Sequence, residues 1–298
     1  MDSLQEVAAV IRKSIDSVNP DLECGFCTSS EGEYVYAAEM AHILAGKNAP
    51  FVRLNNGFYI EDGSLSFPYR QMCTAIQHHY ISQTVDQIIS ECDTYPQNRY
   101  SLTLTGMDMH ITSSLMTGLT GMKMWIENHR RHDEKINRLY LDFVKKNWKR
   151  WREIFRNRDR YRWLGVVTPL PAKAPSYLNP ATNKNSKQIR TGDFMADCFG
   201  VLGIAGSYYD DGSSIVAITG GQLEFFSDNE IRELLRRKMI IDIEGVKELV
   251  KRGFGEDIGV KDVLSGAPQN TFEVITDPEL KAKKVPEVLS VLRPVCGQ

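Results

Sequence analysis

Apolar positions in the first half of the chain alternate between helical spacing and short continuous runs. Apolar residues recur every three or four positions over residues 4–15, which predicts an amphipathic helix ended by Asn19 and Pro20. A second helix is predicted over residues 34–45, with Gly46 as its C-cap. Further helices are predicted over residues 72–89, 111–117 and 132–157, and strands over residues 22–28, 51–54, 90–92 and 122–126. Strands that alternate with helices predict parallel βα units.

The loops that follow these strands are longer and richer in polar and aromatic residues than the loops that follow the helices. The Gly-, Asn-, Asp- and Ser-rich stretch 55–66 is one example. In βα barrels, ligands bind at the end where the strands terminate. We therefore expect a ligand site at the carboxyl ends of the predicted strands.

The pattern changes near residue 161 and predicts a second unit. Strands are expected over residues 163–168 and 214–218, and helices over residues 193–202, 231–238 and 246–252. Ser227 and Glu230 form a capping-box pattern, Asp242 is a helix N-cap, and Gly253 ends the last helix. The predicted domains are residues 1–160 and 161–298.

Composition narrows the class of protein. The chain has 298 residues, of which 42% are hydrophobic and 25% charged, as in ordinary globular domains. Its formal net charge of −2 gives no global attraction for nucleic acid or anionic membranes. The first ten residues lack the basic start and apolar stretch of a signal peptide, so a cytoplasmic location is expected. Six irregularly spaced cysteines, including a lone pair at Cys24 and Cys27, suit reduced thiols.

Residues 130–162 carry far more Lys and Arg than Asp and Glu and include two tryptophans. This is the strongest nucleic-acid signal in the chain. The favoured alternative is a solvated helix whose aromatic side chains pack inward. Its predicted inner face consists of Ile136, Tyr140, Phe143, Asn147, Trp148, Trp151 and Phe155. If this helix is solvated in this way, it offers no nucleic-acid site. Together with the net charge near zero, this leads us to expect that the chain binds neither nucleic acid nor membrane.

Candidate chemistry is concentrated in residues 90–100. Glu91 and Asp93 end a strand and precede a loop with the stacking and hydrogen-bonding groups that sugar hydroxyls require: Tyr95, Asn98 and Arg99. The alternative is that either carboxylate only caps the turn before Pro96.

A second candidate stretch is 122–129. Trp125 at a strand end offers an apolar surface for a sugar ring, and Glu127 lies at the strand exit. His129 and His132 have one-turn spacing but no identifiable third ligand, so no metal or other cofactor is expected.

These residues resemble family-42-type β-galactosidases, over residues 23–260. In that family the seventh barrel strand ends in a Glu, and the loop that follows contains Pro and Asn. The eighth barrel strand is preceded by a Gly, and aromatic residues lie where that strand ends. The matching residues here are Glu91, Pro96, Asn98, Gly121, Trp125 and Glu127. The later part resembles the family's glutamine-amidotransferase-like trimerisation domain. The matching residues there are 227–235, Asp242, 252–255 and 259–260.

The resemblance implies a fold of barrel strands five to eight from a TIM-type (β/α) barrel, followed by a smaller flavodoxin- or amidotransferase-like α/β domain. It implies that Glu91 is the nucleophile of a retaining glycosidase acting on β-linked sugars. Asp93, Tyr95, Asn98, Arg99, Trp125 and Glu127 would bind the sugar.

The family's proton donor, the Glu of an Asn-Glu pair, has no counterpart, since the only such pair is Asn229-Glu230 in the other domain. A complementing N-terminal half or a homo-oligomer is therefore an expected partner, besides the carbohydrate. The alternative is a non-catalytic carbohydrate-binding or assembly module.

Overall fold

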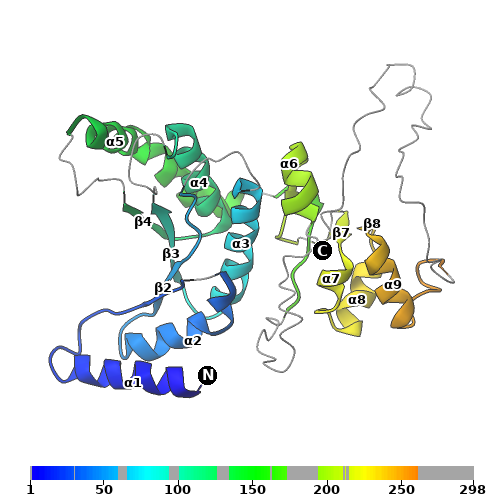
Figure 1. Ribbon diagram of the computed structural model, residues 1–298, viewed down its shortest axis with the longest axis horizontal. Coiled ribbons are helices and arrows are strands. Elements are labelled where there is room, and N and C mark those ends of the chain that lie inside the picture. Colours follow the sequence, from blue (N-terminus) through cyan, green and yellow to red (C-terminus); the bar gives the residue numbers. More distant parts are fainter. Residues whose placement is uncertain are drawn as a thin grey trace.

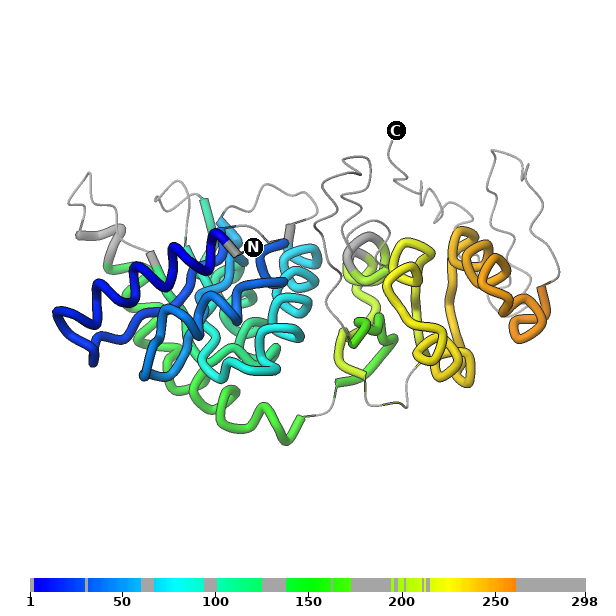
Figure 2. The backbone as a smooth tube through the Cα atoms, turned by 90° about the horizontal axis from the view of Figure 1, so that it is seen from below, coloured from blue at the N-terminus to red at the C-terminus, as the bar shows by residue number. Residues whose placement is uncertain are grey.

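The protein has an α/β fold with two parallel four-stranded sheets, one in each of two lobes that lie side by side (Figures 1 and 2). The computed structural model describes residues 2–29, 31–59, 66–93, 101–125, 134–161, 163–172, 194–210, 212 and 215–260.

The first sheet has the strand order β1-β2-β3-β4, which is the order along the chain. Its strands are β1 (Phe26–Cys27), β2 (Phe51–Leu54), β3 (Gln87–Asp93) and β4 (Gly121–Trp125). The helices of this lobe are α1 (Asp2–Asp16), η1 (Glu31–Glu33), α2 (Tyr34–Ala45), α3 (Ser66–Ile81), α4 (Leu104–Thr117), α5 (Glu134–Asn157) and η2 (Arg158–Arg160). All three strand pairs are parallel, as the alternation of helices and strands predicts.

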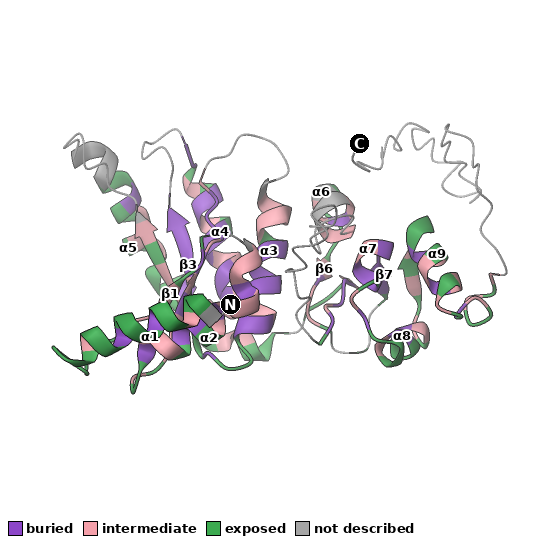
Figure 3. Cartoon of the chain, turned by 60° about the horizontal axis from the view of Figure 1, so that its bottom comes forward, coloured by how far each residue is buried: buried purple, intermediate pink, exposed green. Residues whose placement is uncertain are grey.

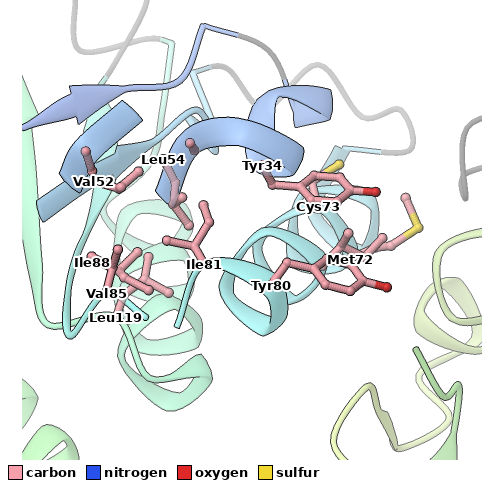
Figure 4. Close-up of a cluster of buried hydrophobic side chains, with 13 residues drawn as sticks. Tyr34, Val52, Leu54, Met72, Cys73, Tyr80, Ile81, Val85, Ile88 and Leu119 are labelled. Carbon is pink, nitrogen blue, oxygen red and sulfur yellow. The ribbon is translucent and has the colours of Figure 1, made fainter. Parts of the chain in front are cut away.

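One face of this sheet packs against the helices and forms the main core. Side chains alternate between the two faces of a strand, and Val52, Leu54 and Ile88 point toward α2 and α3, where they meet Ile81 (Figure 4). These four side chains are at most 1% exposed. Burying each one fully stabilises the fold by about 1.5–3 kcal/mol. The buried residues in Figure 3 accordingly follow the strands and the inner sides of α3 and α4.

The second sheet has the order β6-β5-β7-β8. Its strands are β5 (Val166–Val167), β6 (Gly206–Ser207), β7 (Val216–Ile218) and β8 (Met239–Ile241). The accompanying helices are η3 (Met195–Phe199), α6 (Gly200–Leu202), α7 (Gly220–Leu223), α8 (Asp228–Leu235) and α9 (Ile243–Lys251). A separate core forms around the fully buried Ile218, Leu223, Ile231 and Leu249.

Tyr209 connects the two lobes. Its hydroxyl donates to the Thr117 carbonyl and lies 3.0 Å from Nδ1 of His78, and its ring stacks on Trp163 with centroids 5.3 Å apart. Burial lowers the pKa of His78 to about 4, so the imidazole is neutral at neutral pH. Tyr80 adds a hydrogen bond of 2.9 Å to the Pro171 carbonyl. The junction is therefore held by buried, uncharged hydrogen bonds and aromatic packing.

The structure confirms the predicted helix ends with the clearest chemistry. Ser227 accepts from the Glu230 amide while the Glu230 carboxylate accepts from the Ser227 amide, which is a complete capping box. Asp242 caps α9 by accepting from an amide of its first turn, and Gly46 is the C-cap of α2 with a φ of 61°. Gly253, just after α9, has a φ of 86°.

Four predictions about elements were wrong. The helix expected over 72–89 runs from Ser66 to Ile81, because residues 87–89 pair with β2 instead. The strands expected over 22–28 and 163–168 are only Phe26–Cys27 and Val166–Val167. Trp148, predicted on the inner face of α5, is 55% exposed, whereas Tyr140 and Trp151 are buried as expected. The apolar stripe of α5 is therefore narrower than the distribution of its aromatic residues indicates.

Candidate functional site

The face of the first sheet opposite the main core carries four charged side chains near the carboxyl ends of the strands. We call this set the charged face: Arg53 on β2, Glu91 and Asp93 on β3, and Lys123 on β4. Parallel register places Arg53 beside Ile89, and Glu91 beside Lys123. Because register partners share a face, the four side chains are brought together. The carboxyl edge of a parallel sheet is where α/β proteins bind ligands.

Glu91 is held by two donors that converge on one of its oxygens. Oε2 accepts from Nη1 of Arg53 at 2.7 Å and from the Tyr59 hydroxyl at 3.0 Å. Oε1 faces Nζ of Lys123 at 3.9 Å, which is beyond hydrogen-bond range. The side chain is 9% exposed. Within the described part of the chain, one oxygen of Glu91 is thus fixed by two hydrogen bonds and the other accepts none.

Tyr59 contributes a donor whose proton is firmly held. Burial, and then the negative charge of Glu91, raise the pKa of Tyr59 to about 12. The phenol therefore stays protonated at neutral pH and donates to the carboxylate. A hydrogen bond to an ionised acceptor is stronger than one between neutral groups.

Asp93 forms the second ion pair of the charged face. Its Oδ2 accepts from Nζ of Lys123 at 2.5 Å, while its Oδ1 is buried and has no hydrogen-bond partner among the described residues. Lys123 therefore lies between the two carboxylates, with Asp93 as the closer partner.

Asn56 fixes the backbone of β3 from the other side of the sheet. This fully buried amide accepts from the Glu91 N–H at 2.9 Å and from the Ser90 hydroxyl at 3.1 Å. Its nitrogen donates to Thr74 at 3.2 Å and back to Ser90 at 2.9 Å. Buried polar groups that satisfy one another in this way restrict the strand to one position. The location of Glu91 is therefore set by both faces of the sheet.

The structure brings two of the predicted site residues together, Glu91 and Asp93. Trp125 belongs to β4, where its backbone pairs with Asp93, but its side chain lies outside the described residues. Tyr95, Asn98, Arg99 and Glu127 also lie outside the described residues. The turn-capping alternative has no support for Glu91, because its carboxylate hydrogen-bonds Arg53 and Tyr59 instead.

Sequence reasoning missed Arg53, Tyr59, Lys123 and Asn56. Two of them carried a signal, because Arg53 and Lys123 are lone charges inside short apolar strands. A charge that interrupts an apolar strand needs a partner on the same face. Asn56 and Tyr59 lie in a polar loop and carried no comparable signal.

Among the described residues, no thiol belongs to the charged face. The five described cysteines are free, with Cys27 exposed and Cys92 buried. Burial raises the pKa of Cys92 to about 12, so that thiol stays protonated and unreactive. Among the described residues, no group of three or more His, Cys, Asp or Glu side chains is arranged to hold a metal ion.

Comparisons with protein-family models, curated proteins and solved structures found no match for this chain. The described helices include none that is both long and apolar enough to cross a membrane.

Proposed function

We propose that the chain provides the nucleophile half of a retaining glycosidase that acts on β-linked sugars, with Glu91 as the attacking carboxylate. The observation that carries this proposal is the asymmetry of Glu91: Oε2 is held by Arg53 and Tyr59, while Oε1 has no hydrogen bond to any residue that the structure describes. A carboxylate nucleophile needs this arrangement, because one oxygen must be oriented while the other forms a covalent bond.

The fold is compatible with the family-42-type resemblance. Four parallel strands in chain order, with helices packed on one face, suit strands five to eight of a (β/α) barrel. On that assignment the charged face would line the barrel interior. The second sheet, with the order β6-β5-β7-β8, has the strand order of a doubly wound, flavodoxin-like unit. We propose domains 1–160 and 161–298 on this basis.

The proposed first step is a displacement at the anomeric carbon. Oε1 of Glu91 forms a bond to that carbon while the bond to the leaving oxygen breaks, and the leaving oxygen takes the electron pair. In a normal glycoside that oxygen needs a proton from an acid. Asp93 is the second carboxylate of the charged face, but its Oδ2 accepts from Lys123, so its geometry is that of an acceptor. No described residue of the charged face is therefore assigned as the proton donor.

A substrate with an acidic phenol as leaving group tests the nucleophile independently of the proton donor. Dinitrophenolate leaves without protonation, so 2,4-dinitrophenyl β-galactoside should release at most about one equivalent of phenolate rapidly. Intact-protein and peptide mass spectrometry should then find one hexosyl group on Glu91.

The variant Glu91→Gln should give neither the phenolate burst nor the adduct. Asp108→Asn is a matched control, because Asp108 also pairs with an arginine, Arg150, but lies on α4 away from the charged face. It should behave like the native chain. A burst of the same size in Glu91→Gln, or an adduct at another residue, would rule out Glu91 as the nucleophile.

A second candidate is a carbohydrate-binding or assembly module without turnover. It is favoured by one observation, the pairing of Asp93 with Lys123, which leaves the charged face without a carboxylic acid as proton donor among the described residues. Such a module should bind methyl 1-thio-β-galactoside, which resists hydrolysis, and should form no adduct with the dinitrophenyl substrate. The mass spectrum therefore separates the two functions.

A further inference from the structure

Oδ1 of Asp93 is a buried hydrogen-bond acceptor that lacks a donor among the described residues. The side chain is only 7% exposed. The other oxygen is held by Lys123 at 2.5 Å, so the carboxylate cannot turn to exchange the roles of its two oxygens without losing that bond. A buried acceptor without a donor destabilises the fold, and does so more strongly when the group is charged. An oxygen of this kind at a sheet edge indicates a donor that arrives with a ligand.

The position of this oxygen relates it to Glu91. Asp93 follows Glu91 by two residues on β3, so the two side chains share a face and lie about 6.6 Å apart along the strand. Lys123 contacts both carboxylates, at 3.9 Å for Glu91 and 2.5 Å for Asp93. A pyranose ring whose anomeric carbon meets Oε1 of Glu91 would therefore extend its ring hydroxyls toward Asp93.

The charge balance of the face selects the ligand. The four charges of the charged face sum to zero, and Arg70 is a further positive charge that acts on Tyr59. A phosphate or carboxylate would place a second negative charge next to Oδ1, which repels it, and an ammonium group would add to the positive charges of Lys123 and Arg70. A hydroxyl satisfies the oxygen as a donor and leaves the balance unchanged.

We infer that Asp93 is the specificity-determining acceptor of the site, and that its Oδ1 accepts a ring hydroxyl of an uncharged sugar held against Glu91. The sugar as ligand class rests on the function proposed above. Lys123 positions Asp93 by fixing Oδ2, which keeps Oδ1 directed at the ligand.

Binding of methyl 1-thio-β-galactoside and its monodeoxy analogues, measured by titration calorimetry, tests this inference. On the native chain, removal of the one hydroxyl that reaches Asp93 should weaken binding by about 30-fold, as expected for a hydrogen bond to a charged group. In Asp93→Asn, Lys123 should hold the amide oxygen, which places the amide nitrogen where Oδ1 was. That nitrogen cannot accept a hydrogen bond and can only donate a neutral one to the hydroxyl oxygen, so the parent sugar should bind more weakly, by up to about 30-fold, and the same deoxy analogue should lose less than it does on the native chain.

Control variants distinguish the loss of the Asp93 hydrogen bond from a loss of folding. Asp108→Asn should retain the native preference among the analogues, and circular dichroism should show that each variant is folded. If Asp93→Asn does not fold, Asp93→Ala is the second variant, measured against the same set. Galactosamine and galacturonic acid methyl thioglycosides should both bind more weakly than the uncharged parent.

Three outcomes would overturn the inference: equal affinity of the native chain and Asp93→Asn for the parent sugar, an amino sugar bound more tightly through Asp93, or no binding of any thiogalactoside. The proposed catalytic function fails separately, through the absence of a Glu91 adduct. Sugar binding that depends on Asp93 without an adduct would therefore support this subsite and reject the glycosidase.

Discussion

His110 should make the protein lose stability in mildly acidic solution. This α4 side chain is 3% exposed, lies edge-on to Phe58 with ring centroids 6.2 Å apart, and hydrogen-bonds the backbone of Asn56. Its Nε2 is buried and has no partner among the described residues. A proton added there would be buried without an acceptor, with the positive charge of Arg70 nearby. Burial, opposed in part by the Asn56 hydrogen bond, lowers the pKa of His110 from 6.5 to about 4.

The size and sign of the effect follow from linkage. Between pH 6.5 and about 4, the unfolded chain binds a proton at His110 and the folded chain does not, so the free energy of unfolding falls as the pH falls. Lowering this pKa from 6.5 to about 4 corresponds to about 3 kcal/mol, lost at about 1.4 kcal/mol per pH unit across that window. Above pH 6.5 both states are neutral at this residue and the contribution vanishes.

Urea unfolding from pH 7 to pH 4 measures this slope against a variant that cannot titrate. His110→Gln keeps a side-chain donor for the Asn56 backbone and removes the imidazole. Other titrating groups, including His78, are present in both chains and cancel in the difference. The native chain should lose about 3 kcal/mol more than the variant over the interval. Parallel curves for the two chains would show that His110 does not carry the buried titration and would refute the reasoning.

Three further changes test the packing around the site and between the lobes. Asn56→Ala removes the acceptor of the Glu91 N–H and should lower the free energy of unfolding by about 3 kcal/mol in urea titrations; a loss below about 1 kcal/mol would contradict its role in fixing β3. Ser227→Ala breaks the capping box and should cost about 1 kcal/mol by the same assay, with Ser227→Asp as the control that retains an N-cap. Tyr209→Phe keeps the stacking ring but removes the hydroxyl next to His78, and should cost about 1–2 kcal/mol in thermal unfolding; an unchanged melting temperature would show that this hydroxyl does not hold the lobes together.

Helix positions were predictable where local chemistry determines them. The Ser227 capping box and the Asp242 N-cap act over three residues, so the sequence around each one defines the start of its helix. Gly46, the C-cap of α2, is likewise a local signal. The alternation of helices and strands was sufficient to predict parallel sheets, because parallel strands require such crossovers.

Strand boundaries were less predictable because they depend on pairing. Residues 87–89 continue the helical spacing of α3, yet they form the first part of β3, since their backbone groups pair with β2. β6 (Gly206–Ser207) and β8 (Met239–Ile241) are short and were not predicted. Both contribute to the second sheet through neighbours distant in sequence, and a local pattern carries little information about such pairing.

The candidate site likewise combines residues that the local sequence could predict with residues that only strand pairing brings together. Glu91 was predicted from its place at a strand end, whereas Arg53 precedes it by 38 residues and Tyr59 by 32. Lys123 follows Asp93 by 30 residues. The sequence locates the strand end, but only the register of β2, β3 and β4 determines which charges meet there.

The ion pairs that this register produces also determine which substitution of Glu91 tests its chemical role without disturbing the fold. Each carboxylate of the charged face has a cation within 2.7 Å. Removing Glu91 leaves Arg53, which is 21% exposed, as a poorly solvated charge, and this typically costs more than replacing both partners together. Glu91→Ala would therefore lower activity partly by leaving Arg53 unpaired. Glu91→Gln keeps the side-chain volume and an amide oxygen that accepts from Arg53 and Tyr59, while the nucleophilic carboxylate is lost. A folded Glu91→Gln chain that still binds the thiogalactoside but forms no adduct would assign the loss to the nucleophile rather than to the collapse of the charged face.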